Sequence, residues 1–290
     1  MVTMNKKVVL ITGTNSGFGW LTAQSVAALG HKVYATMRDT TGKNAEKAQA
    51  LSRVENVTVV DLEVTDEASV KKAFDSIIAA EGKVDVLVNN AGASMFGVGE
   101  TSTPADLQRM LDINVIGPWR LMKLAMPGMR ERSDGLIINV TSGFGRVSFP
   151  FFTMYCASKF SLEGLSEGLY YELRPLGVDV VILEPGGFPT EMGSKVQAGT
   201  DIAVAEGYKA LDDYPGKIFS AIGQLFETHK PDPQDIADAV VKLIGAPKGE
   251  RPVRTVVDPT TGQFISAINK GTQIEFNKTM EAYGLRELLA

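Results

Sequence analysis

The 290-residue chain has little of the material from which several kinds of site are built. Its single cysteine, Cys156, excludes an internal disulfide and a cysteine-rich metal centre. Only two histidines, His31 and His229, are present, so zinc sites and histidine-based triads have few candidate residues. No apolar run approaches the roughly 18 residues of a membrane span, and the run at 8–11 is too short for a signal peptide. We therefore expect a cytoplasmic protein with no membrane span and no metal site.

The chain also lacks a basic region. It has 29 Lys and Arg against 34 Asp and Glu, which gives a formal net charge of −5. The basic residues are scattered, so nothing recruits nucleic acid or an anionic membrane surface. No linker, repeat or low-complexity tract divides the chain, and 44% of its residues are hydrophobic. This composition predicts a single globular domain over residues 1–290.

Short runs rich in Val, Ile and Leu alternate with longer amphipathic segments. The runs lie at 7–12, 32–37, 57–61, 84–89, 135–140, 178–183 and 252–257. The helical patterns lie at 17–29, 42–52, 66–80, 104–129, 153–175 and 233–244. Continuous rather than alternating apolar strands indicate burial on both faces. The alternation therefore predicts an α/β domain: a doubly wound parallel sheet of about seven strands with helices on both faces.

Two segments interrupt this alternation. Residues 186–232 form a long insertion after the sixth strand, with glycine, proline and aromatic residues but no strand pattern. Residues 259–290 form an extension after the seventh strand. A long connection within a compact domain is usually a binding loop, so we expect the insertion to contact substrate.

Three glycines, Gly13, Gly17 and Gly19, occupy the turn between the first strand and the first helix. Glycine lets the backbone approach a ligand closely, and the N-terminus of the following helix favours an anion such as a pyrophosphate. The spacing G-x-x-x-G-x-G lacks the Lys-Ser/Thr of a P-loop. By itself this turn is also compatible with glycines that serve packing only.

Further polar motifs follow the later strands. Asn89-Asn90-Ala91-Gly92 follows the fourth strand, Ser142 the fifth, and Pro185-Gly186 the sixth. Tyr155 and Lys159 are four residues apart in a predicted helix, so their side chains share one face. Because the carboxyl ends of parallel strands meet at one edge of the sheet, these groups should gather there.

Together these motifs resemble the short-chain dehydrogenase/reductase family, over residues 6–258. The resemblance implies a Rossmann-type domain, a nicotinamide cofactor and hydride transfer between an alcohol and a carbonyl. It implies the catalytic set Asn114, Ser142, Tyr155 and Lys159. The implied cofactor contacts are Gly13, Asn15, Ser16, Gly17, Phe18, Gly19, Arg38, Leu62, Glu63, Asn90, Ala91, Gly92, Tyr155, Lys159, Pro185, Gly186, Phe188 and Thr190.

Carbonyl reduction needs a proton for the oxygen, and Tyr155 can supply it. The unperturbed pKa of tyrosine is about 10, and a neighbouring ammonium such as that of Lys159 is expected to lower it. The resemblance places Ser142 on the substrate oxygen and gives Asn114 a water that links Lys159 to solvent. Alternatives remain open: Tyr155 and Lys159 also fit an ordinary surface pair, Asn114 a helix kink or cap, and 89–90 a structural brace.

The end of the second strand bears on cofactor choice. In the family, an acid that selects NAD is the last residue of this strand, which here is the uncharged Met37. Arg38 follows and can bind a 2′-phosphate, so we expect NADP(H) and expect Asp39 to point away. The third strand is followed by Leu62-Glu63-Val64, where the family commonly has aspartate in place of the glutamate. Adenine contact is therefore expected from Glu63 or from the backbone of Val64.

Aromatic residues and methionines cluster in the segments expected to line the substrate site. The predicted substrate contacts are Met95, Ser142, Phe144, Phe149, Phe188 and Met192. Such a lining suits a bulky apolar ketone or alcohol, as in the hydroxysteroid and retinol dehydrogenases that this region resembles. Alternatives are a 3-oxoacyl-thioester reductase and a non-catalytic NADP-sensing protein. The family resemblance also implies a homodimer or homotetramer formed through helices 104–129 and 153–175.

Overall fold

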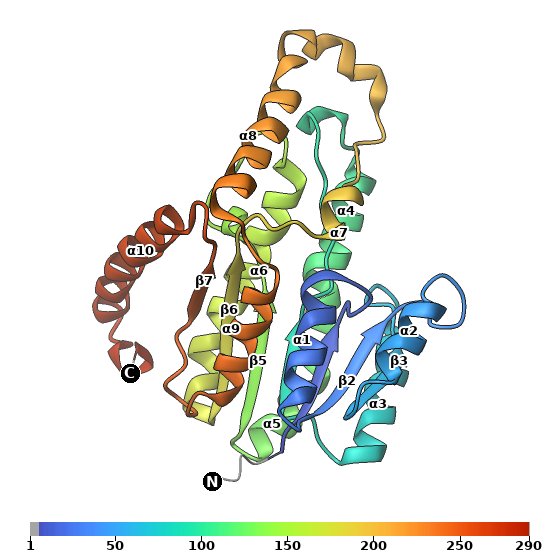
Figure 1. The fold of residues 1–290 in the computed structure, drawn as a ribbon. Coiled ribbons are helices and arrows are strands. Elements are labelled where there is room, and N and C mark those ends of the chain that lie inside the picture. Colours follow the sequence, from blue (N-terminus) through green and yellow to red (C-terminus); the bar gives the residue numbers. More distant parts are fainter. Residues whose placement is uncertain (1–5, 290) are drawn as a thin grey trace.

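The computed structural model describes residues 6–289, in which seven strands form one parallel sheet (Figure 1). The strands are β1 Val8–Thr12, β2 Lys32–Met37, β3 Val57–Asp61, β4 Val86–Asn89, β5 Gly135–Val140, β6 Val178–Pro185 and β7 Arg254–Val257. Their order is β3-β2-β1-β4-β5-β6-β7. The predicted seven-stranded parallel sheet is confirmed, and every strand lies within a residue or two of its predicted position.

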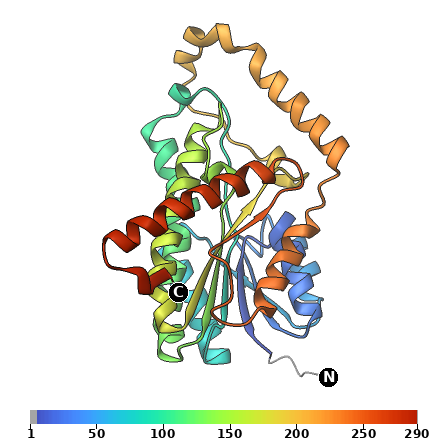
Figure 2. The ribbon, with the colours of Figure 1, turned by 90° about the vertical axis from the view of Figure 1, so that its left-hand side faces the viewer.

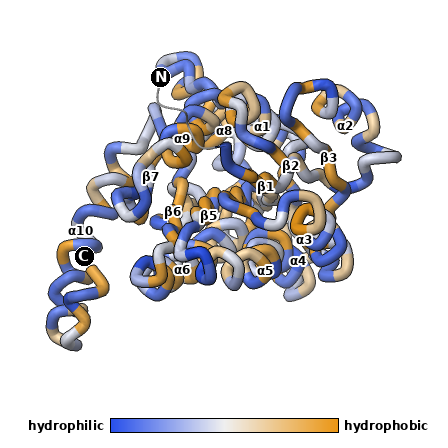
Figure 3. The backbone as a smooth tube through the Cα atoms, turned by 90° about the horizontal axis from the view of Figure 1, so that it is seen from below, coloured by the Kyte–Doolittle hydropathy of each residue, from blue (hydrophilic) through white to orange (hydrophobic). Residues whose placement is uncertain are grey.

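Helices cover both faces of the sheet, which confirms the doubly wound arrangement (Figure 3). One layer consists of α1 Gly17–Ala28, α2 Ala45–Ser52 and α9 Gln234–Gly245. The other consists of α3 Glu67–Glu81, α4 Pro104–Leu111, α5 Gly117–Glu131 and α6 Thr153–Leu173. Each strand contributes alternate side chains to the two layers, so the interior divides into two apolar clusters separated by the sheet.

The sheet reverses its winding direction beside β1, which pairs with β2 on one side and with β4 on the other. The chain leaves the carboxyl end of β1 toward one face of the sheet and that of β4 toward the other. In open sheets of this kind, ligands bind at such a point. The glycine turn after β1 and the Asn-Asn-Ala-Gly segment after β4 both border this point.

The predicted continuous helix over 104–129 is wrong in one respect. A π-helical turn, Asp112–Ile116, separates α4 from α5. The reason is in the sequence: Pro118 has no N–H, so it cannot donate the bond that a regular α-helix would direct to the carbonyl of Asn114. The turn places Asn114, which is 1% exposed, in the interior beside α6.

The insertion at 186–232 is helical and projects from the body of the domain (Figure 2). It contains α7 Glu191–Ser194, a 3₁₀ segment Ile202–Leu211 and α8 Asp213–His229, and none of these three elements has a buried residue. An isolated bridge joins Met95 to Gln197. The predicted absence of a strand holds for the insertion, all of which the structure describes.

The extension at 259–290 forms α10, Gly262–Ala282, and a short 3₁₀ turn, Arg286–Leu289. In α10 the side chains of Ile265 and Met280 are buried, and Ile265 packs on Gly143 in the turn after β5. Within residues 6–289, no helix is long and apolar enough to cross a membrane.

Candidate active site

The four predicted catalytic residues come from three elements and meet at the carboxyl ends of β4 and β5. Tyr155 and Lys159 share a face of α6 and are buried, while Ser142 follows β5 and caps the 3₁₀ turn that begins at Gly143. Lys159 Nζ lies 5.7 Å from the centroid of the Tyr155 ring and donates to the carbonyl of Val140 at 3.0 Å. The buried placement rules out a solvated surface pair of Tyr155 and Lys159.

Burial dominates the acid–base properties of this pair. It raises the pKa of Tyr155 to about 12, although a hydrogen bond with Ser142 acts in the opposite direction. Burial also lowers the pKa of Lys159 to about 8, against the field of Glu163. The expected lowering of the Tyr155 pKa by Lys159 is therefore not found in the protein alone. A phenolate at this buried position would lose its hydration, and the ammonium of Lys159 is turned to the carbonyl of Val140.

The side chain of Asn114 is fully used within the protein. Its Oδ1 accepts from the N–H of Ala93 at 2.8 Å, and its Nδ2 donates to the carbonyl of Ala93 and to Ser158 Oγ, both at 2.9 Å. The amide thus ties the π turn to the segment after β4 and to α6. A water held by Asn114 would have to bind its main-chain carbonyl. In a regular α-helix this carbonyl would accept from the N–H of residue 118, but Pro118 has none.

The glycine turn fits an anionic group at the N-terminus of α1. The helix begins after Ser16, which makes no side-chain cap, and its first turn contains no acidic residue, so its N–H groups remain available to a ligand. Gly13 has a φ of +70°, and a Cβ there would lie 2.8 Å from the Cα of Ala91. Gly19 allows a similar close approach to the carbonyl of Gly13. These two glycines let the turn pack on the segment after β4.

Asparagines brace this region, as one of the open interpretations suggested. Asn90 Nδ2 donates to the carbonyls of Thr12 and Gly13, and Asn89 Nδ2 donates to Asn139 Oδ1 at 2.8 Å. The side chain of Asn15 is likewise within hydrogen-bond distance of Asn44, at 3.3 Å. The amides of Asn89 and Asn90 therefore hold the strand ends in place.

The remaining predicted cofactor contacts line the same edge. A Cβ on Gly92 would lie 3.7 Å from Lys159 Nζ, and one on Gly17 would lie 3.5 Å from Thr190. Phe18 and Phe188 stack edge to face at 5.4 Å. Gly186 leaves room for Asp258, with which a side chain would collide. Gly17 therefore lies beside Thr190 and Gly92 beside Lys159, and their contact with a cofactor stays a prediction.

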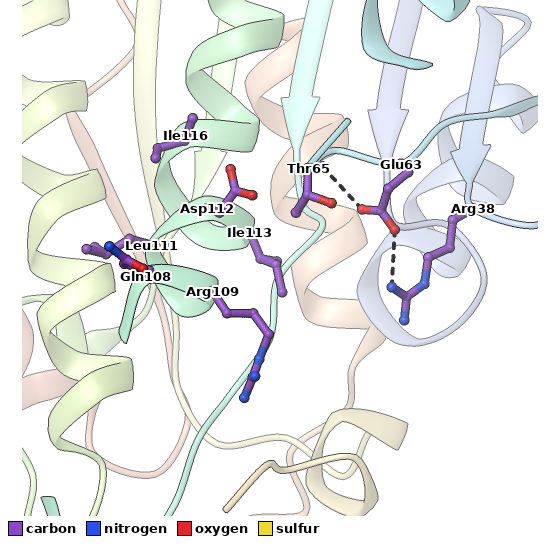
Figure 4. A pocket seen from close by; sticks show the side chains of 9 residues that line it. All are labelled: Arg38, Glu63, Thr65, Gln108, Arg109, Leu111, Asp112, Ile113 and Ile116. Atoms are coloured by element: carbon purple, nitrogen blue, oxygen red, sulfur yellow. Dashed lines mark hydrogen bonds and ion pairs between the residues drawn. The ribbon is translucent and has the colours of Figure 1, made fainter. Parts of the chain in front are cut away.

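A cleft of about 600 Å³ lies at the carboxyl ends of β2 and β3 (Figure 4). Arg38 and Glu63 line it together with Arg109 of α4, which the sequence did not suggest. Arg38 Nη1 donates to Glu63 Oε2 at 3.1 Å, so the unusual glutamate is turned toward the arginine. Met37 ends β2 and is buried, and Asp39 accepts from the N–H of Lys43 at 2.7 Å. Asp39 thus points away from the cleft, as expected.

An aromatic cluster lies beside Tyr155. The ring of Phe152 is 6.2 Å from that of Tyr155 and 4.9 Å from that of Phe96. Phe219 of α8 stacks at 4.9 Å from Phe96, so the insertion contributes to the cluster. The other members are Phe144, Phe149 and Phe151. Three segments far apart in the sequence thus place apolar rings next to a polar centre.

The predicted substrate contacts divide into two groups. Phe144 and Phe149 stack at 4.9 Å within the aromatic cluster, and Met192 of α7 is 37% exposed. Met95 and Phe188, by contrast, are 3% and 8% exposed, and Phe188 belongs to the apolar cluster under α1. The burial of these two side chains gives them a packing role, and their contact with substrate stays a prediction.

A second group of polar residues was not predicted from the sequence. Glu163, Glu184, Arg254 and Asn269 form a buried network directly behind α6. One signal was present: Glu163 follows Lys159 by four residues and therefore continues the face of Tyr155 and Lys159. Glu184 was hidden in an apolar strand, where nothing in the pattern marks a buried acid.

Comparison with known proteins agrees with this geometry. The family model "short chain dehydrogenase" matches residues 7–201, which is more than half of the chain. The chain belongs to this family. It is 38% identical to 3-ketodihydrosphingosine reductase of Bacteroides thetaiotaomicron over 187 residues, 64% of this chain and 66% of that protein. It is 34% identical to human 17-beta-hydroxysteroid dehydrogenase type 1 over 258 residues, 84% of this chain and 76% of that protein.

Two solved structures extend the comparison. A short-chain dehydrogenase from Streptomyces avermitilis superposes with a TM-score of 0.74 at 30% identity, covering 97% of this chain and 98% of that chain. ElxO, solved with NADP bound, gives a TM-score of 0.71 at 27% identity, covering 88% of this chain and 98% of that chain. The chain is thus a member of an oxidoreductase family whose solved relatives bind nicotinamide cofactors.

Proposed function

We propose that the protein is an NADP(H)-dependent oxidoreductase that interconverts a carbonyl and a secondary alcohol on a bulky apolar substrate. The observation that carries the proposal is a buried Tyr155–Lys159 pair with Ser142 beside it, placed between an open helix N-terminus and an aromatic cluster. The nicotinamide cofactor supplies the hydride when bound. The residues of this chain hold and orient the two reactants and handle the proton.

Tyr155 donates a proton to the carbonyl oxygen in reduction and takes it back in oxidation. A pKa of about 12 keeps the phenol protonated at neutral pH, which suits the reductive direction. Ser142 Oγ accepts from the N–H of Phe144 at 3.1 Å, and its hydroxyl hydrogen, which bonds Tyr155 in this structure, would turn to the substrate oxygen. Lys159 binds the cofactor ribose and returns a proton to Tyr155, and the carbonyl of Asn114 holds the water that connects Lys159 to solvent.

The proposed preference for NADP(H) rests on the end of β2. Met37 offers no carboxylate to a ribose 2′-hydroxyl, while Arg38 lies at the rim with 66% of its side chain exposed and can meet a 2′-phosphate. Arg38 is paired with Glu63 in the protein alone, and a phosphate would compete with that carboxylate. The NADP bound to ElxO supports this preference by analogy.

The proposed substrate class rests on the aromatic cluster and on two relatives. The rings of Phe96, Phe152 and Phe219 provide apolar surface next to Tyr155, which favours a large hydrophobic ketone over a sugar. The relatives named for ketodihydrosphingosine and for hydroxysteroids point to bulky substrates of the same kind. A homodimeric or homotetrameric assembly and a cytoplasmic location stay predictions.

The test is a set of initial rates of NADPH and NADH oxidation with ketones from an acetoacetyl thioester through aryl ketones to keto-steroids. Tyr155→Phe is compared with Tyr170→Phe, which makes the same chemical change on the same helix but away from the site. We expect turnover of the bulky ketones with NADPH, lowered about 10²- to 10⁴-fold by Tyr155→Phe and unchanged by Tyr170→Phe. Binding of NADPH without turnover would overturn the enzymatic proposal, and preference for the thioester would overturn the substrate class.

A further inference from the structure

Three carboxylates gather around one arginine behind the catalytic face of α6. Arg254 of β7 donates through both terminal nitrogens to Glu167, at 3.2 and 2.9 Å. Its Nε donates to Glu163 Oε2 at 3.0 Å and also lies 3.4 Å from Glu184 Oε1. The side chains of Glu163, Glu184 and Arg254 are 2%, 0% and 6% exposed. Two buried acids therefore lie beside one N–H group, which donates to Glu163 alone.

This arrangement leaves one acid without a full ionic partner. Arg254 is matched by Glu167 and Glu163, and Glu163 also accepts from Thr141 Oγ1 at 2.6 Å. Glu184 Oε1 has no hydrogen-bond partner in the described part of the chain. A second buried carboxylate beside the same cation is costly to ionise, because the one arginine already bonds two other carboxylates.

Asn269 of α10 completes the network from the extension. Arg146, in the segment after Ser142, donates through Nε to Asn269 Oδ1 at 2.7 Å. Because an arginine can only donate, this bond fixes the amide so that its Nδ2 faces Glu184, where it donates to Oε2 at 2.6 Å. Asn269 thus bridges the turn after β5 to the end of β6, immediately before Pro185-Gly186.

The network contacts each part of the site from behind. Glu163 lies one helical turn beyond Lys159, and Thr141 directly precedes Ser142. Gly145 approaches so closely that a Cβ there would lie 2.9 Å from Glu163 Cγ. The network therefore links α6, the Ser142 turn and the end of β6, where Glu184 precedes the Pro-Gly turn.

We propose that Glu184 is a positioning residue of the reaction, held as the neutral acid, and that Asn269 and Arg254 use it to couple α10 to the catalytic face of α6. The role in the reaction rests on the proposed function of Tyr155 and Lys159, whereas the protonation state of Glu184 does not. The extension at 259–290 is then part of the working site rather than an appendage.

The charged groups that surround Glu184 agree with a neutral acid. Glu163 and Glu167 face it from α6, Arg254 from β7, Arg146 from the segment after β5, and α10 offers only the uncharged Asn269. Burial and the charge of Glu163 raise the pKa of Glu184 to about 8, against Arg254 and Arg146. Since the folded-state pKa lies above the ordinary 4.5, this proton stabilises the fold most at low pH, and the contribution is lost as the pH rises through about 8.

The first measurement needs no turnover. Infrared difference spectra of the cofactor-free protein at neutral pH compare the wild type with Glu184→Gln. We expect the carbonyl band of a protonated carboxyl group in the wild type, its absence in the variant, and its loss from the wild type as the pH passes about 8. The unfolding temperature should fall more steeply as the pH rises from 5 to 9 in the wild type than in Glu184→Gln. A wild-type spectrum without the band would overturn the neutral acid.

The second measurement tests positioning through kcat and the KM for NADPH. Glu184→Gln keeps a neutral group of the same shape, so kcat should stay within about twofold, whereas Glu184→Ala and Asn269→Ala should lower kcat about tenfold. Gln273→Ala is the matched control, because Gln273 is one turn further along α10 and bonds Tyr171 instead. Equal loss in Glu184→Gln and Glu184→Ala, or in Gln273→Ala and Asn269→Ala, would overturn the positioning role. An inactive wild type that shows the band would instead refute the proposed function alone.

Discussion

The predicted catalytic residues and the insertion at 186–232 are built in opposite ways. Asn114, Ser142, Tyr155 and Lys159 are all less than 10% exposed, and polar bonds from neighbouring elements surround them. The helices of the insertion have no buried residue, and Figure 2 shows them standing away from the sheet. The proposed chemistry therefore falls on side chains that the fold holds in place, and the proposed substrate contact on a segment with no buried residue in its helices.

This difference has an energetic basis. A buried polar group without its partner costs about 1–3 kcal/mol, so the catalytic residues can change little without affecting the fold. The insertion is tied to the rest of the domain mainly by polar contacts, such as Thr200 to Asp106 at 2.7 Å and Tyr208 to Glu100 at 2.5 Å. Segments with few buried contacts open at low cost, so the insertion can adapt to a ligand while the site beneath it stays fixed.

The largest effect should follow from removing the buried ammonium. Lys159→Met keeps an apolar stem of similar length, and we expect kcat/KM for ketone reduction to fall about 10²- to 10⁴-fold. Stability should fall by no more than about 1–3 kcal/mol, the cost of leaving one carbonyl, that of Val140, unpaired. Steady-state rates and thermal unfolding measured on the same preparation check this. A variant that unfolds many degrees lower would show that Lys159 serves the fold rather than the chemistry.

The pH dependence of ketone reduction also tests the role of Lys159. The pKa of Lys159 is lowered to about 8, so its ammonium form is lost as the pH rises through that value, while Tyr155 stays protonated to about 12. Because kcat/KM reports the ionisations of the free enzyme, the reductive kcat/KM should be flat below about pH 8 and fall above it. The fall should persist in Glu184→Gln. A profile that is flat to pH 10 would contradict the assignment to Lys159.

An intermediate effect is expected at the rim of the cofactor groove, where a side chain is exposed but its partner is charged. A hydrogen bond to a charged group contributes about 1.5–3 kcal/mol, so Arg38→Ala should weaken NADPH binding about 10- to 100-fold and leave NADH binding unchanged. Calorimetric titration with both cofactors measures this. Arg109→Ala, in the same cleft, is the matched control; equal weakening by both variants would indicate a general field rather than a specific contact.

The regions that the sequence predicted well are those where pattern and chemistry are both local. The seven strands follow from continuous apolar runs, and the positions of Tyr155 and Lys159 follow from helical spacing. Predicting the π turn at Asn114 would have required knowing how the helix rearranges its hydrogen bonds around Pro118, and the hydrophobic pattern does not show this. The network around Glu184 depends on α10, which meets β6 only through the tertiary fold. Local periodicity contains no information on such a long-range contact.

The smallest effect should come from the insertion itself. Phe219 stacks on Phe96 but is 50% exposed, so Phe219→Ala should raise the KM for a keto-steroid about three- to tenfold, since burying an aromatic ring contributes a few kcal/mol at most and this ring is half open. The KM for a small aryl ketone, kcat and thermal stability should stay unchanged. Phe264→Ala on α10, where the ring is 63% exposed and outside the cluster, is the control. If Phe219→Ala lowers kcat for every ketone alike, the insertion takes part in positioning the reacting groups, and the division between a fixed catalytic site and an adaptable insertion does not hold.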